Sequence, residues 1–190
     1  MEYNKHYNLS GKHAILSASQ YHWLNYTPEG MRKSYENKLK KEEGTYLHDL
    51  ASRLIKTHTY LKPLKKAFNQ FVNDSIGYGM ESELVLYYSD NCFGTADAIK
   101  YDEENGLLRI HDLKTGITKP SFNQLNIYAA LFCLEYSVDP FDINFEERLY
   151  QGFDFEINSP DQDLIREIMD KIIEMDQVVT QAMIEYKGIF

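Results

Sequence analysis

Two aspartates and a lysine stand at the most informative positions of this sequence, in the stretch from Gly94 to Gly116, GTADAIKYDEENGLLRIHDLKTG. Asp97 lies in one short apolar run, and Asp112 ends the next run after a turn near DEENG. We expect these runs to pair as a hairpin, which would bring the two carboxylates within roughly 5–7 Å of each other. Carboxylates that close repel unless a cation lies between them, and oxygen ligands of this kind suit Mg²⁺ or Mn²⁺. The pair therefore predicts a divalent metal site.

Lys114 follows Asp112 by two residues, so on a strand both side chains point to the same face. An ammonium beside a metal pocket can orient a water or balance charge on a phosphate in the transition state. A surface hairpin with alternating polar positions would give the same residue pattern. The residues alone leave both interpretations open.

We expect the N-terminal part of the chain to be helical. Ser17 or Ser19 can cap a short helix, and residues 30–57 are mostly good helix formers with Gly44 as the expected interruption. Apolar residues at helical spacing predict an amphipathic helix over residues 45–57: Leu47, Leu50, Ala51, Leu54 and Ile55. A further helix is expected with Pro63 in its first turn and with Gly77 and Gly79 at its end.

After the expected helices, the residue pattern changes to short runs rich in β-branched and aromatic residues. SELVLYY, CFGTADAIKY and LLRIHDLK predict three antiparallel strands, and FDINFEERLYQGFDFEI predicts one or two more. SFNQLNIYAALFCLEY has a helical period, and a long helix is expected after Ser159. The order predicts an α/β (α+β) fold with a mixed central sheet flanked by helices and an N-terminal helical segment.

The length and charge of the chain limit the domain organisation that it can have. With 190 residues, 43% of them hydrophobic, we expect one domain, with a basic helical part at 1–78, a sheet core with one helix at 79–157 and a helix at 158–190. The net charge is −9, yet residues 1–70 hold 12 Lys and Arg against 6 Asp and Glu. The basic segment is either a solvated helix face or a surface that binds a polyanion.

The two cysteines and the N-terminus indicate the compartment. Cys92 and Cys133 lie in apolar surroundings, and the polar start MEYNKHYNLSGKH lacks the apolar core of a signal peptide. We expect a reduced, intracellular, cytoplasmic protein. The longest apolar run, YAALFCL, is far below the roughly 20 residues of a membrane-spanning helix, so no membrane partner is expected.

Four short motifs in order resemble those of the PD-(D/E)-x-K nuclease superfamily, and most closely its RecB-like exonucleases. They are Gly44-x-x-x-His48, Gly94-x-x-Asp97, Asp112-x-Lys114 followed by Thr115 and Gly116, and Gln124-x-x-x-Tyr128. That group includes CRISPR-associated RecB-like nucleases and the mitochondrial genome-maintenance exonuclease. The resemblance implies a restriction-endonuclease-like core.

The resemblance also implies roles for individual residues. Asp97 and Asp112 would be metal ligands, the backbone carbonyl of Leu113 would add an oxygen, and His48 would reach the metal from the opposite side. Lys114 would be the catalytic lysine, and Gln124 and Tyr128 would line the active site and hold the lysine or the DNA. Without the motifs, His48 would read as a capped or partly buried helix histidine and Tyr128 as a core residue.

Some features of this chain extend or depart from the family pattern. Relatives carry a supporting glutamate before the first aspartate; Glu81 and Glu83 are candidates, and we prefer Glu83, although a salt-bridged edge acid fits equally well. Many RecB-like enzymes hold an iron–sulfur cluster with four cysteines, and two cysteines exclude such a cluster within one chain. No Walker motif occurs, so no helicase motor is built in.

These observations predict a Mg²⁺- or Mn²⁺-dependent DNA nuclease that cleaves phosphodiester bonds by in-line attack of a metal-bound water. We expect an exonuclease for single-stranded or end-containing DNA in recombination, repair or replication, with a recombination or replication protein as a further partner. A structure-selective endonuclease and a nuclease fold kept as a binding module remain alternatives, and oligomeric state is open. A basic helix surface would contact backbone phosphates, and its aromatic residue would stack on unpaired bases: Arg32, Lys33, Tyr35, Lys38, Lys40 and Lys41.

Overall fold

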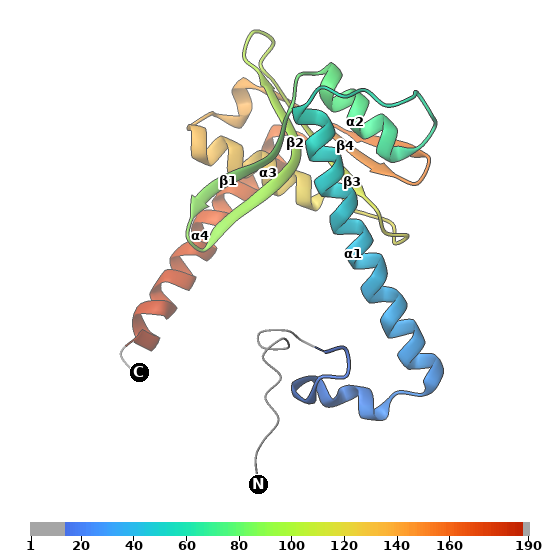
Figure 1. Cartoon of the computed structure of the whole chain (residues 1–190). Coiled ribbons are helices and arrows are strands. Elements are labelled where there is room, and N and C mark those ends of the chain that lie inside the picture. Colours follow the sequence, from blue (N-terminus) through green and yellow to red (C-terminus); the bar gives the residue numbers. More distant parts are fainter. Residues whose placement is uncertain (1–13, 188–190) are drawn as a thin grey trace. The chain divides into compact units, whose positions relative to one another are not determined.

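The computed structural model describes residues 14–187 of the chain (Figure 1). The polar N-terminal segment MEYNKHYNLSGKH lies outside the described residues. By its contacts the chain divides into two compact units, with the division between Thr45 and Tyr46, and each unit is described by itself. The expectation of one domain therefore stays a prediction.

The first unit contains a short 3₁₀ helix, η2 (Ala18–Asn25), and the first part of α1 (Pro28–Lys56). Ser17 precedes η2, but its side chain makes no capping hydrogen bond. The expected interruption at Gly44 is wrong, because α1 continues through it without a break. A single glycine costs a helix only about 1 kcal/mol, which many good helix formers on both sides outweigh.

The second unit opens with the end of α1 and with α2 (Ala67–Gly77). The expected start at Pro63 is wrong, because α2 begins only at Ala67 and the irregular segment before it is held by side-chain amides. Asn73 on α2 accepts from the N–H of Leu61 and donates to its carbonyl, at 2.8 and 2.9 Å. These bonds satisfy backbone groups that a helix would otherwise pair, so the helix begins later.

A five-stranded mixed sheet forms the centre of the second unit, in the order β1-β2-β3-β4-β5. β1 (Glu81–Ser89), β2 (Cys92–Asp102) and β3 (Leu107–Lys114) are an antiparallel meander, as expected. The chain then crosses over through α3 (Asn123–Tyr136), so that β4 (Asn144–Gln151) is parallel to β3, and β5 (Asp154–Asn158) closes the edge as an antiparallel neighbour of β4. A short 3₁₀ turn, η3 (Pro140–Asp142), precedes β4.

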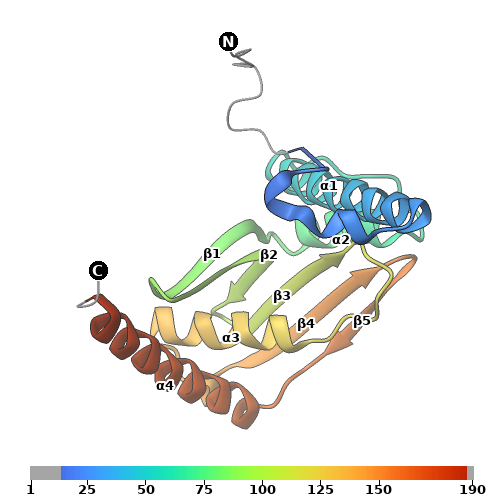
Figure 2. The same ribbon diagram turned by 90° about the horizontal axis from the view of Figure 1, so that it is seen from below.

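Helices cover both faces of this sheet (Figure 2). On one face, α3 and α4 (Gln162–Lys187) pack over a core that includes Ile99, Ile110 and Leu149. On the other face, α2 and the end of α1 pack over Ala98, Leu113 and Tyr150. The chain is therefore a mixed α/β protein with a helix-flanked mixed sheet, as predicted. No helix of the described residues is both long enough and apolar enough to cross a membrane.

Candidate active site

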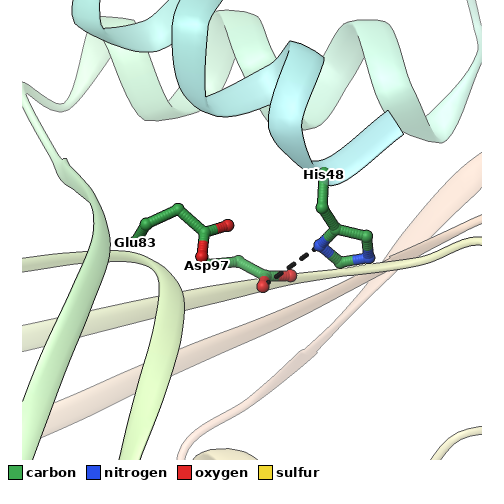
Figure 3. A group of neighbouring side chains, drawn as sticks. All are labelled: His48, Glu83 and Asp97. Atoms are coloured by element: carbon green, nitrogen blue, oxygen red, sulfur yellow. Dashed lines mark ion pairs between the residues drawn. The ribbon is translucent and has the colours of Figure 1, made fainter. Parts of the chain in front are cut away.

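Three side chains from three different elements meet at one end of the sheet. His48 comes from α1, Glu83 from β1 and Asp97 from β2, and one ligand atom of each lies within 4.8 Å of the others. Figure 3 shows the imidazole of His48 reaching down from its helix toward the two carboxylates. His48 Nδ1 lies 3.2 Å from Asp97 Oδ1. These three residues are called the His–Glu–Asp cluster below.

Glu83 reaches the cluster through an unusual backbone conformation. Its φ is +54°, in the left-handed region that residues with a side chain seldom adopt. The strand pairs Ser82↔Ala98 and Leu84↔Ala96 flank it, so Glu83 and Asp97 stand across from each other between them. A non-glycine residue held there costs of order 1–3 kcal/mol, and such strain concentrates at functional sites.

His48 is fixed because the second half of α1 is anchored to the sheet. Ser52, one helical turn after His48, shares a buried hydrogen bond of 3.0 Å with Ser82, which neighbours Glu83. On the same helix Ala51 and Ile55 are buried in the core. The contact thus ties the helix that carries the histidine to the strand that carries the glutamate.

Asp97 is oriented by the strand beside it. The backbone N–H of Leu113 donates to Asp97 Oδ2 at 2.8 Å, which leaves Oδ1 facing His48. Leu113 was expected to contribute its carbonyl to a metal; what the structure gives is this contact through its N–H, and the role of the carbonyl stays a prediction.

Asp112 lies beside the His–Glu–Asp cluster and not in it. Its carboxylate is only 2% exposed, and the ammonium of Lys114 lies 2.9 Å from Oδ2 and donates to Oδ1 at 3.1 Å. Burial, and then the charge of Asp97, raise the pKa of Asp112. Asp112 Oδ2 has the Lys114 ammonium as its charged partner and makes no further hydrogen bond within the described part of the chain.

Lys114 is held by a chain of hydrogen bonds that ends at Tyr128, whose ring packs against a glycine. Its Nζ donates to Gln124 Oε1 at 2.6 Å, and Gln124 Nε2 donates to the Tyr128 hydroxyl at 2.8 Å. The ring of Tyr128 lies against Gly94: a Cβ at that position would come within 2.9 Å of its Cε1. The glycine, glutamine and tyrosine of the motifs therefore act together to place the lysine.

The charges within the cluster shift the pKa values of two of its members. A hydrogen bond to Asp97 is the main cause that raises the pKa of His48, and partial burial followed by the charge of Asp97 raises the pKa of Glu83, although that side chain is largely exposed. A proton on His48 offsets the carboxylate repulsion in this arrangement, and a divalent ion would offset it more strongly. One imidazole and two or three carboxylates are a donor set that fits Mn²⁺ or Mg²⁺.

The six residues expected to bind DNA all lie on α1 within the first unit and are exposed: Arg32, Lys33, Tyr35, Lys38, Lys40 and Lys41. Lys38 forms an exposed ion pair of 3.8 Å with Glu42. The other side chains are exposed to solvent, where they could contact a polyanion, and their role stays a prediction.

Sequence reasoning missed the residues that support the site. Ser52 and Ser82 give no motif signal, although a small polar residue four positions after His48 would lie on the same face of a helix. Gln151 is a second omission: its side chain donates to the carbonyls of Gly116 and Thr118 in the loop after Lys114. These are long-range contacts, which spacing along the sequence does not reveal.

Comparison of this chain with protein-family models, with curated proteins and with solved structures gives no match. The geometry of the His–Glu–Asp cluster and its neighbours is therefore what bears on the function of this chain.

Proposed function

We propose that this chain is a Mg²⁺- or Mn²⁺-dependent deoxyribonuclease with a restriction-endonuclease-like core, acting as an exonuclease on single-stranded or end-containing DNA. One observation carries the proposal: His48, Glu83 and Asp97 offer three ligand atoms within 4.8 Å, beside a lysine held by Asp112 and Gln124. A salt-bridged surface hairpin would need neither the histidine from α1 nor the strained backbone of Glu83.

The residues divide the chemistry of phosphodiester hydrolysis among them. His48, Glu83 and Asp97 would hold the ion, and Asp112, whose pKa is raised in part by the charge of Asp97, would add an oxygen. When bound, the ion would lower the pKa of a water and neutralise charge on the phosphoryl oxygens. Lys114 presents an ammonium, fixed by two partners, that can orient the attacking water or stabilise charge in the transition state.

The fold supports this proposal by the way it assembles the site. The aspartates come from adjacent antiparallel strands, and the crossover helix α3 brings Gln124 and Tyr128 back over the same end of the sheet. DNA is the proposed partner because the first part of α1 exposes a run of lysines and arginine that can neutralise phosphates without reading sequence. A protein of recombination, repair or replication is a further proposed partner.

The experiment that tests the proposal uses end-labelled DNA. Purified protein is incubated with linear single strands labelled at either end, with duplex and with circular single strands, in Mg²⁺, Mn²⁺ or EDTA. We expect metal-dependent loss of linear DNA, intact circles, and loss of activity in Lys114→Ala. Lys100→Ala is the matched control, because Lys100 is an exposed lysine on the same hairpin.

Each alternative has its own outcome in this assay. Cleavage of circular single strands would show that the protein is an endonuclease and not an exonuclease. If the protein binds DNA without metal, cleaves none of the substrates, and binds equally well as Lys114→Ala, it is a binding module and the proposal is overturned.

A further inference from the structure

The loop that leaves β3 after Lys114 exposes an apolar side chain at its tip. Ile117 is 96% exposed, the highest value among the large apolar side chains that the structure describes; the next, Phe153, is 74% exposed. Single exposed aliphatic residues are common on protein surfaces and need no explanation by themselves. Two further features set Ile117 apart.

The first feature is that the backbone on both sides of Ile117 is held. Gln151 Nε2 donates to the carbonyl of Gly116 at 2.6 Å and to the carbonyl of Thr118 at 2.9 Å. Gln151 itself is fixed on β4, where it pairs with Lys114. One side chain thus clamps the loop at the two residues that flank Ile117, and this holds an apolar group in water where a free loop could fold it away.

The second feature is the position of this loop relative to the reacting groups. Ile117 follows Lys114 by three residues, so the two Cα atoms are at most about 10 Å apart. The same loop carries the exposed Lys119, which can contact a backbone phosphate. If a phosphate of a DNA strand contacts Lys114, this spacing allows the neighbouring nucleotide to contact Ile117.

We propose that Ile117 is a wedge that contacts the base next to the scissile phosphate and unstacks the terminal pair of a duplex end. Apolar side chains inserted at base steps do this in other DNA-binding proteins, where the contact offsets the cost of unstacking. Gln151 is the positioning residue that keeps the wedge extended. The inference rests on the proposed nuclease function and adds to it the ability to act on paired ends.

The test compares cleavage of a linear single strand with cleavage of a blunt duplex of the same sequence. Ile117→Ser is expected to slow duplex cleavage by about tenfold or more and to change single-strand cleavage by less than about twofold, since only the duplex needs the wedge. Ile117→Leu should retain both rates. Val178→Ser is the matched control, because Val178 is a β-branched residue, 57% exposed, on α4.

Gln151→Leu tests the clamp with Ile117 in place. It should lower the duplex rate selectively, with the thermal unfolding midpoint measured beside it to separate loop release from a general loss of stability. If Ile117→Ser slows both substrates equally, or neither, the wedge is refuted while the nuclease proposal stands.

A second measurement separates failure of the inference from failure of the nuclease function. In Lys114→Ala, binding of a duplex with 2-aminopurine in its terminal pair should raise the fluorescence of that base, and Ile117→Ser should abolish the rise. This signal needs no cleavage. If the wild type cleaves nothing, the nuclease proposal fails, and absence of an Ile117-dependent rise overturns the wedge as well.

Discussion

Substitution of Gly94 by alanine tests whether the glycine positions the catalytic lysine through Tyr128. A Cβ at this position would lie 2.9 Å from Cε1 of Tyr128 and 3.6 Å from its Cδ1. Ordinary contact begins near 3.4 Å, so the ring would have to retreat by about 0.5 Å or more. Tyr128 is buried in the core between α3 and the sheet, which leaves little room for that movement.

Two effects of Gly94→Ala follow from this geometry. Overpacking of a filled core costs about 1–3 kcal/mol, so the free energy of unfolding should fall by that amount. Displacement of the ring moves the hydroxyl that accepts from Gln124, and with it the oxygen that holds Lys114. Misplacement of reacting groups by as little as 1 Å can cost about 10²-fold in rate, so cleavage should fall by about 10- to 100-fold.

The assay is urea unfolding together with initial cleavage rates on linear single-stranded DNA. Gly77→Ala is the matched control, because no atom lies within 4 Å of a Cβ at Gly77 and its φ is not positive. This control should keep full activity and gain up to about 1 kcal/mol, as a helical glycine replaced by alanine does. The reasoning is refuted if Gly94→Ala is as stable and as active as Gly77→Ala.

Three further predictions concern strain and buried charge. Glu83→Gly should be about 1 kcal/mol more stable than Glu83→Ala in urea unfolding, because only glycine adopts the φ of +54° without strain. Both variants should bind Mn²⁺ more weakly in calorimetry. Equal stability of the two variants would contradict the presence of backbone strain. Glu147 is fully buried, and burial raises its pKa from 4.5 to about 7, so its contribution to stability is full below pH 4.5 and is lost as the pH rises toward 7. Relative to Glu147→Gln, the free energy of unfolding of the wild type should fall by on the order of 3 kcal/mol over that range. A difference between the two proteins that does not change with pH would refute this. Burial lowers the pKa of His111 from 6.5 to about 3, so the pH dependence has the opposite sign: its contribution to stability is full above pH 6.5 and falls as the pH drops toward 3. His111→Gln should therefore reduce the loss of stability between pH 6.5 and pH 3 in a series of unfolding measurements. An unchanged loss would assign acid unfolding to other groups.

Much of the fold was predictable because its signals are local. The three meander strands, the crossover helix and the C-terminal helix each have a local residue pattern bounded by turn or capping residues, and the structure confirms them. The errors at Gly44 and Pro63 arose where local rules compete with context. A lone glycine did not interrupt α1, and the amide of Asn73 holds the backbone of Leu61 in a non-helical segment just before Pro63.

The candidate site was predictable in its residue types and less so in its grouping. The sequence placed Asp97 and Asp112 together as the metal pair, whereas the structure groups Asp97 with His48 and Glu83 and pairs Asp112 with Lys114. The preference for Glu83 over Glu81 rested on the family pattern alone, because no residue pattern in the sequence predicts the left-handed backbone that the structure has at Glu83.

The central claim is that the His–Glu–Asp cluster binds the ion that drives cleavage, and the most direct test is the Mn²⁺ dependence of the cleavage rate. Glu83→Gln is compared with Glu81→Gln, since Glu81 is an exposed glutamate on the same strand that lies outside the cluster. The account predicts that Glu83→Gln raises the Mn²⁺ concentration for half-maximal rate by about tenfold or more, as loss of one charged ligand should, and that Glu81→Gln leaves it unchanged. Equal half-saturation in both variants and the wild type would contradict it.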